Sequence, residues 1–202
     1  MKALILTDIQ YDFLPGGALA VEDGDKVIPI ANKVQHKFDL IVATQDWHPE
    51  NHGSFASNQE GKEPMDKGKL GGLDQVFWPD HCVQGSRGAE LHDDLNTNKI
   101  EAIFRKGMEP EIDTYSTFFD NGHKKDTGLN AYLKGRDIDH VYVTGLAADF
   151  CVYYTLKDAV NLGYETTLIK DATRAIDKEN FENNIMKELK ESGVKIITSD
   201  EL

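Results

Sequence analysis

Side chains that could share one chemical site follow four of the short apolar runs in this 202-residue chain. In chain order they are Asp8, Asp46 with His48, Lys106 and Cys151. If the runs are parallel strands, their carboxyl ends meet at the edge where open α/β sheets bind ligands. The spacing therefore predicts a carboxylate, an ammonium group, a thiol and metal-ligating groups at one edge of a sheet.

Cys151 is the candidate nucleophile, because it follows a Gly-Leu-Ala-Ala turn and opens an expected helix. Backbone N–H groups and the helix dipole favour a thiolate there and could hold a developing oxyanion. The alternative for a lone cysteine is a small buried core residue. Cys82 lacks such a setting and is interpreted as structural. An 82–151 disulfide is possible on paper, but a reducing compartment disfavours it.

Two further strand-end residues have the chemistry to serve a thiol nucleophile. Asp8 could act as its general base, the alternative being a turn or capping hydrogen bond. Lys106 could be a fixed cation that favours the thiolate, the alternative being a solvated surface lysine. Composition alone leaves both alternatives open, whereas the shared position after buried strands favours the catalytic interpretation.

A possible metal site begins with the Asp46-x-His48 pair. His52 follows four residues later, and His81 lies farther along the same irregular stretch. One carboxylate with two or three imidazoles suits Zn²⁺, Mn²⁺ or Fe²⁺ with open coordination positions. The alternative is a set of surface histidines in a long loop. Five of the seven histidines lie between His48 and His123, which makes a metal site competitive with that alternative.

Alternation of apolar runs with helical patterns predicts the fold. Several runs are apolar on both faces, as parallel strands covered by helices on both sides are. Apolar stripes at helical spacing predict helices between them. The fold class is α/β: a doubly wound, mainly parallel sheet with helices on both faces. The six expected strands cover 3–6, 40–43, 100–104, 141–143, 166–169 and 194–197, and the clearest helices 25–37, 152–160 and 177–192.

Two segments, 49–85 and 107–128, show little regular pattern. Long irregular stretches in a domain are usually functional or disordered. Their histidines and aromatic residues argue against disorder. No repeat, low-complexity tract or linker is visible, so residues 1–202 are expected to form one domain.

Composition excludes several classes of function. Lys and Arg number 22 against 35 Asp and Glu, a formal net charge of −13, which argues against a nucleic-acid partner. No apolar stretch is long enough to span a membrane, and no secretory signal is expected at the N-terminus. Two cysteines do not form a disulfide scaffold, so the expected location is the reducing cytoplasm. A homo-oligomer remains open.

Six motifs together resemble the pyrazinamidase/nicotinamidase family of the isochorismatase-like cysteine hydrolases. The resemblance runs from residue 2 to about residue 198, in order and with family-like spacing. It implies an isochorismatase-like hydrolase fold. The motifs are Asp8-Ile9-Gln10-Tyr11-Asp12-Phe13, Asp46-Trp47-His48-Pro49-Glu50-Asn51-His52-Gly53-Ser54-Phe55, Trp78-Pro79-Asp80-His81-Cys82-Val83, Arg105-Lys106-Gly107, Asp113-Thr114-Tyr115-Ser116 and Gly145-Leu146-Ala147-Ala148-Asp149-Phe150-Cys151-Val152.

The resemblance also implies roles for individual residues. Asp8, Lys106 and Cys151 match a catalytic triad, and the N–H groups of Ala147 and Cys151 match an oxyanion hole beside a cis Leu146–Ala147 peptide. Metal ligands are implied at Asp46, His48 and His81, with His52 a ligand in some members. The residues that match the ring-stacking pocket are Phe13, Leu19, Trp78 and Tyr115.

The implied activity is hydrolysis of nicotinamide to nicotinate and ammonia through a thioester on Cys151, a step of NAD salvage. Pyrazinamide is an expected second substrate. One divalent metal is implied, zinc foremost, with iron or manganese as alternatives. Ala148-Asp149-Phe150 and Thr114 depart from the usual family residues without changing a reacting group, so they bear on fine substrate preference.

Three other functions remain open. An amide or ureido hydrolase of the same superfamily, acting on carbamoyl-sarcosine-like substrates, would keep the triad but generally lack the metal. An isochorismatase-type vinyl-ether hydrolase would not release ammonia from nicotinamide. A non-catalytic binding module is disfavoured because all three triad residues are present. Metal analysis and a nicotinamide assay separate these functions.

Overall fold

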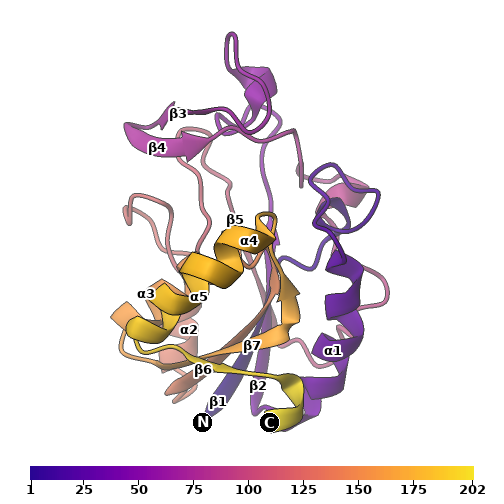
Figure 1. Cartoon of the computed structure of the whole chain (residues 1–202), viewed down its shortest axis with the longest axis vertical. Helices are drawn as coiled ribbons and strands as arrows, with labels where there is room; N and C mark the ends of the chain where they lie inside the picture. The colour runs from indigo at the N-terminus through magenta and orange to yellow at the C-terminus, as the bar shows by residue number, and fades with distance from the viewer.

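A six-stranded, wholly parallel sheet organises the chain, which a computed structural model describes over residues 1–202. The strand order is β5-β2-β1-β6-β7-β8 (Figure 1). This confirms the doubly wound α/β fold and all six expected strands. Their bounds are β1 (Lys2–Thr7), β2 (Leu40–Asp46), β5 (Ala102–Lys106), β6 (His140–Leu146), β7 (Glu165–Arg174) and β8 (Lys195–Ile197).

Helices cover both faces of the sheet, as the apolar runs require. On β1, Ala3 and Ile5 pack toward one hydrophobic cluster, while Leu4 and Leu6 pack toward the other. Alternate side chains of a strand point to opposite faces, so a strand with two apolar faces is buried on both. Helix α1 (Val27–Val34) lies on one side of the sheet, and α2 (Leu129–Lys134), α3 (Cys151–Asn161) and α5 (Met186–Glu191) lie on the other (Figure 1). One cluster includes buried residues of α1, and the other includes buried residues of α2, α3 and α5.

The expected helices are found, with local differences. The 25–37 segment is α-helical only in α1, which lies between two 3₁₀ turns. Pro29 lies in the first turn of α1, where the missing backbone N–H costs little stability. The 177–192 segment comprises α4 (Lys178–Asn180), a π-helical turn at Phe181–Ile185 and α5. The Asp177 carboxylate accepts the Asn180 N–H at 2.9 Å and so caps this helix as expected. Helix α2 was not expected.

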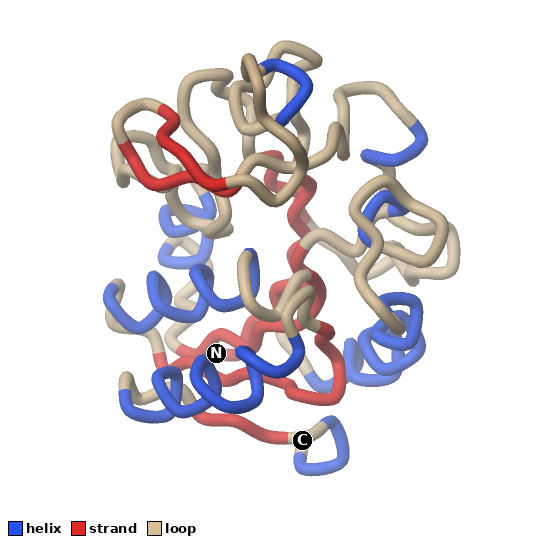
Figure 2. Tube along the Cα trace, turned by 45° about the horizontal axis from the view of Figure 1, so that its top comes forward, coloured by secondary structure: helices blue, strands red, loops and turns tan.

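The two irregular segments lie at the carboxyl end of the sheet, where Figure 2 shows loops gathered. Residues 107–128 contain no helix or strand, as expected. The 49–85 segment differs, because it contains the antiparallel hairpin of β3 (Lys67–Leu70) and β4 (Leu73–Val76). Gly71 and Gly72, with φ of +59° and +85°, allow its tight turn. The hairpin strands are mostly polar, so the apolar pattern did not reveal them.

The helix that carries the candidate nucleophile is anchored by Leu156, which is fully buried. Leu156→Ala is expected to lower the free energy of unfolding by about 2–5 kcal/mol, because it leaves a cavity in a packed core. Urea denaturation measures the change. Lys187→Ala on the exposed face of α5 is the control and should change stability by less than about 0.5 kcal/mol. Equal effects of the two substitutions would contradict the packing described here.

No helix of the structure is both long and apolar enough to cross a membrane.

Candidate active site and metal centre

The candidate site lies where the direction of sheet winding reverses. The chain adds strands on one side of β1 and then, from β6 onward, on the other, which leaves a crevice at the carboxyl ends of β1 and β6. Asp8 follows β1 with a left-handed backbone (φ +48°), which turns the chain out of the sheet. Asp46 ends β2, Lys106 ends β5 and Cys151 opens the helix after β6. The structure thus brings these four predicted residues together.

Lys106 is the centre of this group. Its Nζ lies 2.9 Å from Asp8 Oδ2, 2.6 Å from Asp46 Oδ1 and 3.5 Å from Cys151 Sγ. It also donates to the Thr114 carbonyl at 3.0 Å. Burial acts to lower the pKa of Lys106, but Asp46 and Asp8 outweigh burial and raise it well above its usual value. The group is therefore a fixed cation beside the thiol.

Asp8 is oriented by a buried hydroxyl on β2. Thr44 Oγ1 donates to Asp8 Oδ1 at 2.6 Å, which leaves Oδ2 on the side of Lys106. Burial raises the pKa of Asp8, against the opposing effect of the Lys106 cation. A carboxylate with a raised pKa accepts a proton more readily than an exposed one, which suits a general base.

Cys151 differs in one respect from expectation. Burial raises the pKa of its thiol well above the usual value, and Lys106 lowers it less than burial raises it. Asp8 and Asp46 act in the same direction as burial, because two nearby carboxylates disfavour a third negative charge. These effects favour the thiol over the thiolate, and Asp8 is the neighbouring carboxylate that could take its proton.

Two backbone N–H groups beside the thiol are without acceptors in the protein. Neither the Ala147 N–H nor the Cys151 N–H donates a hydrogen bond to another protein group. The Leu146–Ala147 peptide bond is cis, as the resemblance implies. Unpaired N–H groups next to a nucleophile can hold the oxygen of a tetrahedral intermediate.

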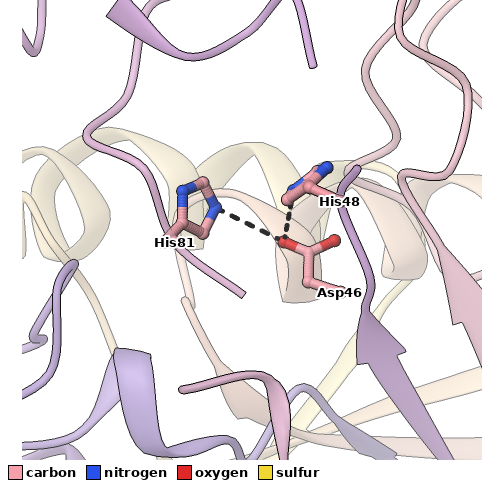
Figure 3. A group of neighbouring side chains, drawn as sticks. All are labelled: Asp46, His48 and His81. Atoms are coloured by element: carbon pink, nitrogen blue, oxygen red, sulfur yellow. Dashed lines mark ion pairs between the residues drawn. The ribbon is translucent and has the colours of Figure 1, made fainter. Parts of the chain in front are cut away.

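Asp46, His48 and His81 form a compact, buried group of candidate metal ligands (Figure 3). Asp46 Oδ2 lies 3.3 Å from His48 Nε2 and 3.6 Å from His81 Nε2. The other ring nitrogens, both Nδ1, contact the carbonyls of Gly107 and Pro79 at 2.8 Å. A carbonyl only accepts, so each Nδ1 carries a hydrogen and each Nε2 faces Asp46. In the neutral form of each ring, that Nε2 is the nitrogen able to bind a metal.

This donor set fits a divalent metal such as zinc. A carboxylate oxygen and two imidazole nitrogens lie within 4.8 Å of one another, and three protein ligands leave positions open. Burial acts to raise the pKa of Asp46, but Lys106 and His48 hold it well below its usual value, so the ligand is ionised. Gly107 allows the close approach, because a Cβ there would lie 2.4 Å from His48 Cε1.

His52 lies beside the group, with its ring centroid 4.4 Å from that of His48. It falls into a different cluster of potential ligands, with His48 and Asp113. Its Nδ1 accepts the Ser54 N–H at 3.2 Å, and burial lowers its pKa to about 4, so the ring is neutral. The hydrogen then resides on Nε2, which has no partner. His52 as arranged presents a donor to the site, so Asp46, His48 and His81 are the group better arranged to hold a metal.

An aromatic pocket adjoins the thiol and the ligand group. All four predicted pocket residues line a pocket that also reaches Cys151 and the three candidate metal ligands. Trp78 Nε1 donates to the Tyr115 hydroxyl at 3.3 Å, which fixes two of the walls. The four residues are Phe13, Leu19, Trp78 and Tyr115.

Three further pocket residues were not predicted as such: Asp113, Phe150 and Ile176. Phe150 packs edge-on against Trp78, with ring centroids 4.8 Å apart, and its position before Cys151 was a signal that could have found it. Ile176 follows β7 and is held by Asp149, whose carboxylate accepts the Ile176 N–H at 3.0 Å. No sequence pattern pointed to Ile176.

Comparisons with known proteins agree with this geometry. Residues 2–201 match the family described as Isochorismatase domain. The chain is 49% identical over 180 residues to the nicotinamidase of Escherichia coli, covering 87% of this chain and 84% of that protein. The solved nicotinamidase/pyrazinamidase of Acinetobacter baumanii superposes with a TM-score of 0.96 at 46% identity, over 99% of this chain and 97% of that one.

A second solved structure bears on the metal. The pyrazinamidase of Pyrococcus horikoshii, determined in complex with zinc, has a TM-score of 0.79 at 39% identity and covers 98% of both chains. The chain thus resembles, in sequence and fold, a protein that was solved with zinc, and its own candidate donor set fits such a metal.

Proposed function

The chain belongs to the isochorismatase family of hydrolases, and on that basis we propose that it converts nicotinamide to nicotinate and ammonia. We propose pyrazinamide as a second substrate. One observation carries the proposal: a buried thiol stands 3.5 Å from a lysine ammonium, within an aromatic pocket that also contains a metal-ligating group. That pocket suits a flat ring bearing a carboxamide.

In the proposed reaction, Asp8 takes the proton of the Cys151 thiol and Lys106 offsets the charge on sulfur. The sulfur attacks the carboxamide carbon, and the N–H groups of Ala147 and Cys151 hold the resulting oxyanion. Asp8 gives the proton to the departing nitrogen, so the C–N bond breaks and ammonia leaves a thioester behind.

The thioester is then hydrolysed. Asp8, again ionised, accepts a proton from a water molecule whose oxygen bonds to the carbonyl carbon. The C–S bond breaks and the proton on Asp8 returns to the sulfur of Cys151. The second proton of the water passes from the product carboxyl group to ammonia or solvent, so the product is nicotinate. Lys106 keeps a neighbouring positive charge throughout, because its raised pKa prevents loss of its proton.

Asp46, His48 and His81 would hold one divalent metal, for which zinc is the proposed identity. When bound, the metal supplies a Lewis acid for a ring nitrogen or a water at that wall of the pocket. Because Asp46 also contacts Lys106, the ligand group and the catalytic residues share one carboxylate.

We propose that the reaction serves NAD salvage in the cytoplasm. Both cysteines are free and buried, which is in keeping with a reducing compartment.

The decisive experiment measures ammonia release by purified protein. Nicotinamide and pyrazinamide should both yield ammonia, metal analysis should find about one zinc per chain, and a chelator should abolish activity until zinc is restored. Release of ammonia from carbamoyl-sarcosine but not from nicotinamide, by a protein without metal, would favour the related ureido hydrolases instead.

Pocket binding is tested separately with Trp78→Leu. The loss of the Trp78 ring is expected to raise KM for nicotinamide roughly tenfold with a smaller change in kcat. Stacking on that ring stabilises the bound substrate and the transition state alike. Steady-state kinetics measure both constants. Trp47→Leu is the matched control, since the Trp47 ring packs under the Arg105 guanidinium outside the pocket. A similar rise in KM in both variants would argue against the role of Trp78.

A further inference from the structure

The side chain of Gln10 makes three hydrogen bonds around the backbone of Asp46. Its Oε1 accepts the Asp46 N–H at 2.8 Å, and its Nε2 donates to the Asp46 carbonyl at 2.8 Å. The same Nε2 donates to the Ala89 carbonyl at 2.8 Å. Gln10 has no exposed surface. A buried amide with donors and acceptor all satisfied holds its partners in a fixed geometry.

The arrangement follows from the unequal lengths of two neighbouring strands. Pairing between β1 and β2 ends at Leu6 and Ala43, because the chain turns out of the sheet at Asp8. Strand β2 continues to Asp46. The Asp46 N–H and carbonyl therefore lack a partner strand on the β1 side. The amide of Gln10 bonds to both groups, as the backbone of a continuing strand would.

We propose that Gln10 is a positioning residue that fixes Asp46 for two separate contacts of its carboxylate. Oδ1 contacts the Lys106 ammonium, whereas Oδ2 faces His48 Nε2 and His81 Nε2. Both contacts depend on the direction of the same Cα–Cβ bond. A shift of the Asp46 backbone would therefore loosen the ligand group and the lysine together. The link to catalysis rests on the proposed function, whereas the link to metal affinity does not.

Gln45 provides a matched control from the same region. It is a buried glutamine whose Nε2 donates to the same Ala89 carbonyl, at 3.1 Å. Its side chain makes no hydrogen bond to the backbone of Asp46. A variant of Gln45 thus reproduces the loss of a buried amide without releasing Asp46.

The test compares Gln10→Met with Gln45→Met by zinc affinity, thermal stability and kinetics. Competition with a chromophoric chelator should show zinc binding weakened about ten- to a hundred-fold in Gln10→Met, the size of effect seen when groups supporting a ligand are removed. Gln45→Met should bind zinc within about twofold of the wild type, even where its Tm falls as far. At saturating zinc, Gln10→Met should lower kcat for nicotinamide more than it raises KM, because the contact of Asp46 with Lys106 loosens.

Gln10→Glu provides a second variant if Gln10→Met does not fold. It keeps the acceptor for the Asp46 N–H but loses the donors to the two carbonyls, so zinc binding should again weaken. Wild-type zinc affinity in a folded Gln10 variant, or equal losses in the Gln10 and Gln45 variants, would overturn the proposal. A wild-type protein that binds zinc but releases no ammonia from nicotinamide would instead overturn the proposed function alone.

Discussion

Replacement of Cys151 by alanine is expected to lower kcat/KM for nicotinamide by at least about 10⁴-fold, because the reaction loses the atom that attacks the amide. Zinc content should stay unchanged, since Sγ lies outside the group formed by Asp46, His48 and His81. Ammonia release under steady-state conditions, together with metal analysis of the same sample, measures both expectations.

Cys82→Ala is the matched control for this prediction. Cys82 is also buried and free, but it belongs to the hydrophobic cluster that includes α1, and its Sγ donates only a long hydrogen bond, 4.0 Å, to the Gly88 carbonyl. Activity should persist in Cys82→Ala. Substantial turnover by Cys151→Ala, or equal loss in both variants, would show that the nucleophile lies elsewhere.

Asp8→Asn is expected to lower kcat by about 10²–10⁴-fold, the usual contribution of a general acid and base. The amide has nearly the shape of the carboxylate, but it cannot take the proton of Cys151. Asp158→Asn is the control, because Asp158 is a buried aspartate on α3 whose pKa is likewise raised by burial and which contacts His123 instead. Comparable loss of kcat in both variants would contradict the assignment.

The pH dependence supports the same test. Burial raises the pKa of Asp8, and only the ionised form can act as the base. Activity of the wild type should therefore fall as the pH drops through a pKa above the ordinary aspartate value of 3.8. The raised pKa of Lys106 keeps the cation charged across this range. A pH–rate profile whose acid limb is identical in Asp8→Asn would assign the limb to another group.

The ion pairs explain how the thiol and the candidate metal ligands form one site. Lys106 Nζ lies between Asp8 and Asp46, and Asp46 in turn faces the two imidazoles. A buried charge is stable only beside an opposite charge, so the Lys106 ammonium keeps both carboxylates at fixed positions. Substitutions at the metal ligands should therefore disturb the catalytic residues as well.

Sequence reasoning predicted the sheet and the edge that carries the site. Both faces of a parallel strand are buried, so its apolar run is visible in the sequence itself, as in residues 40–43 at the start of β2. Residues directly after such runs must lie at the carboxyl edge, which is why Asp8, Lys106 and Cys151 could be placed together. The polar hairpin of β3 and β4 was missed, because it has no apolar pattern of this kind.

Only the tertiary structure decided which groups orient the reacting ones. Thr44 fixes one oxygen of Asp8 across 36 residues, Gln10 holds Asp46 across the same separation, and Ile176 reaches the pocket from the end of β7. The physical reason is that the pattern of neighbouring residues indicates which positions are buried and where the chain turns, but not which distant segments meet. Hydrogen bonds between distant segments depend on where each strand ends and in which direction its backbone leaves the sheet.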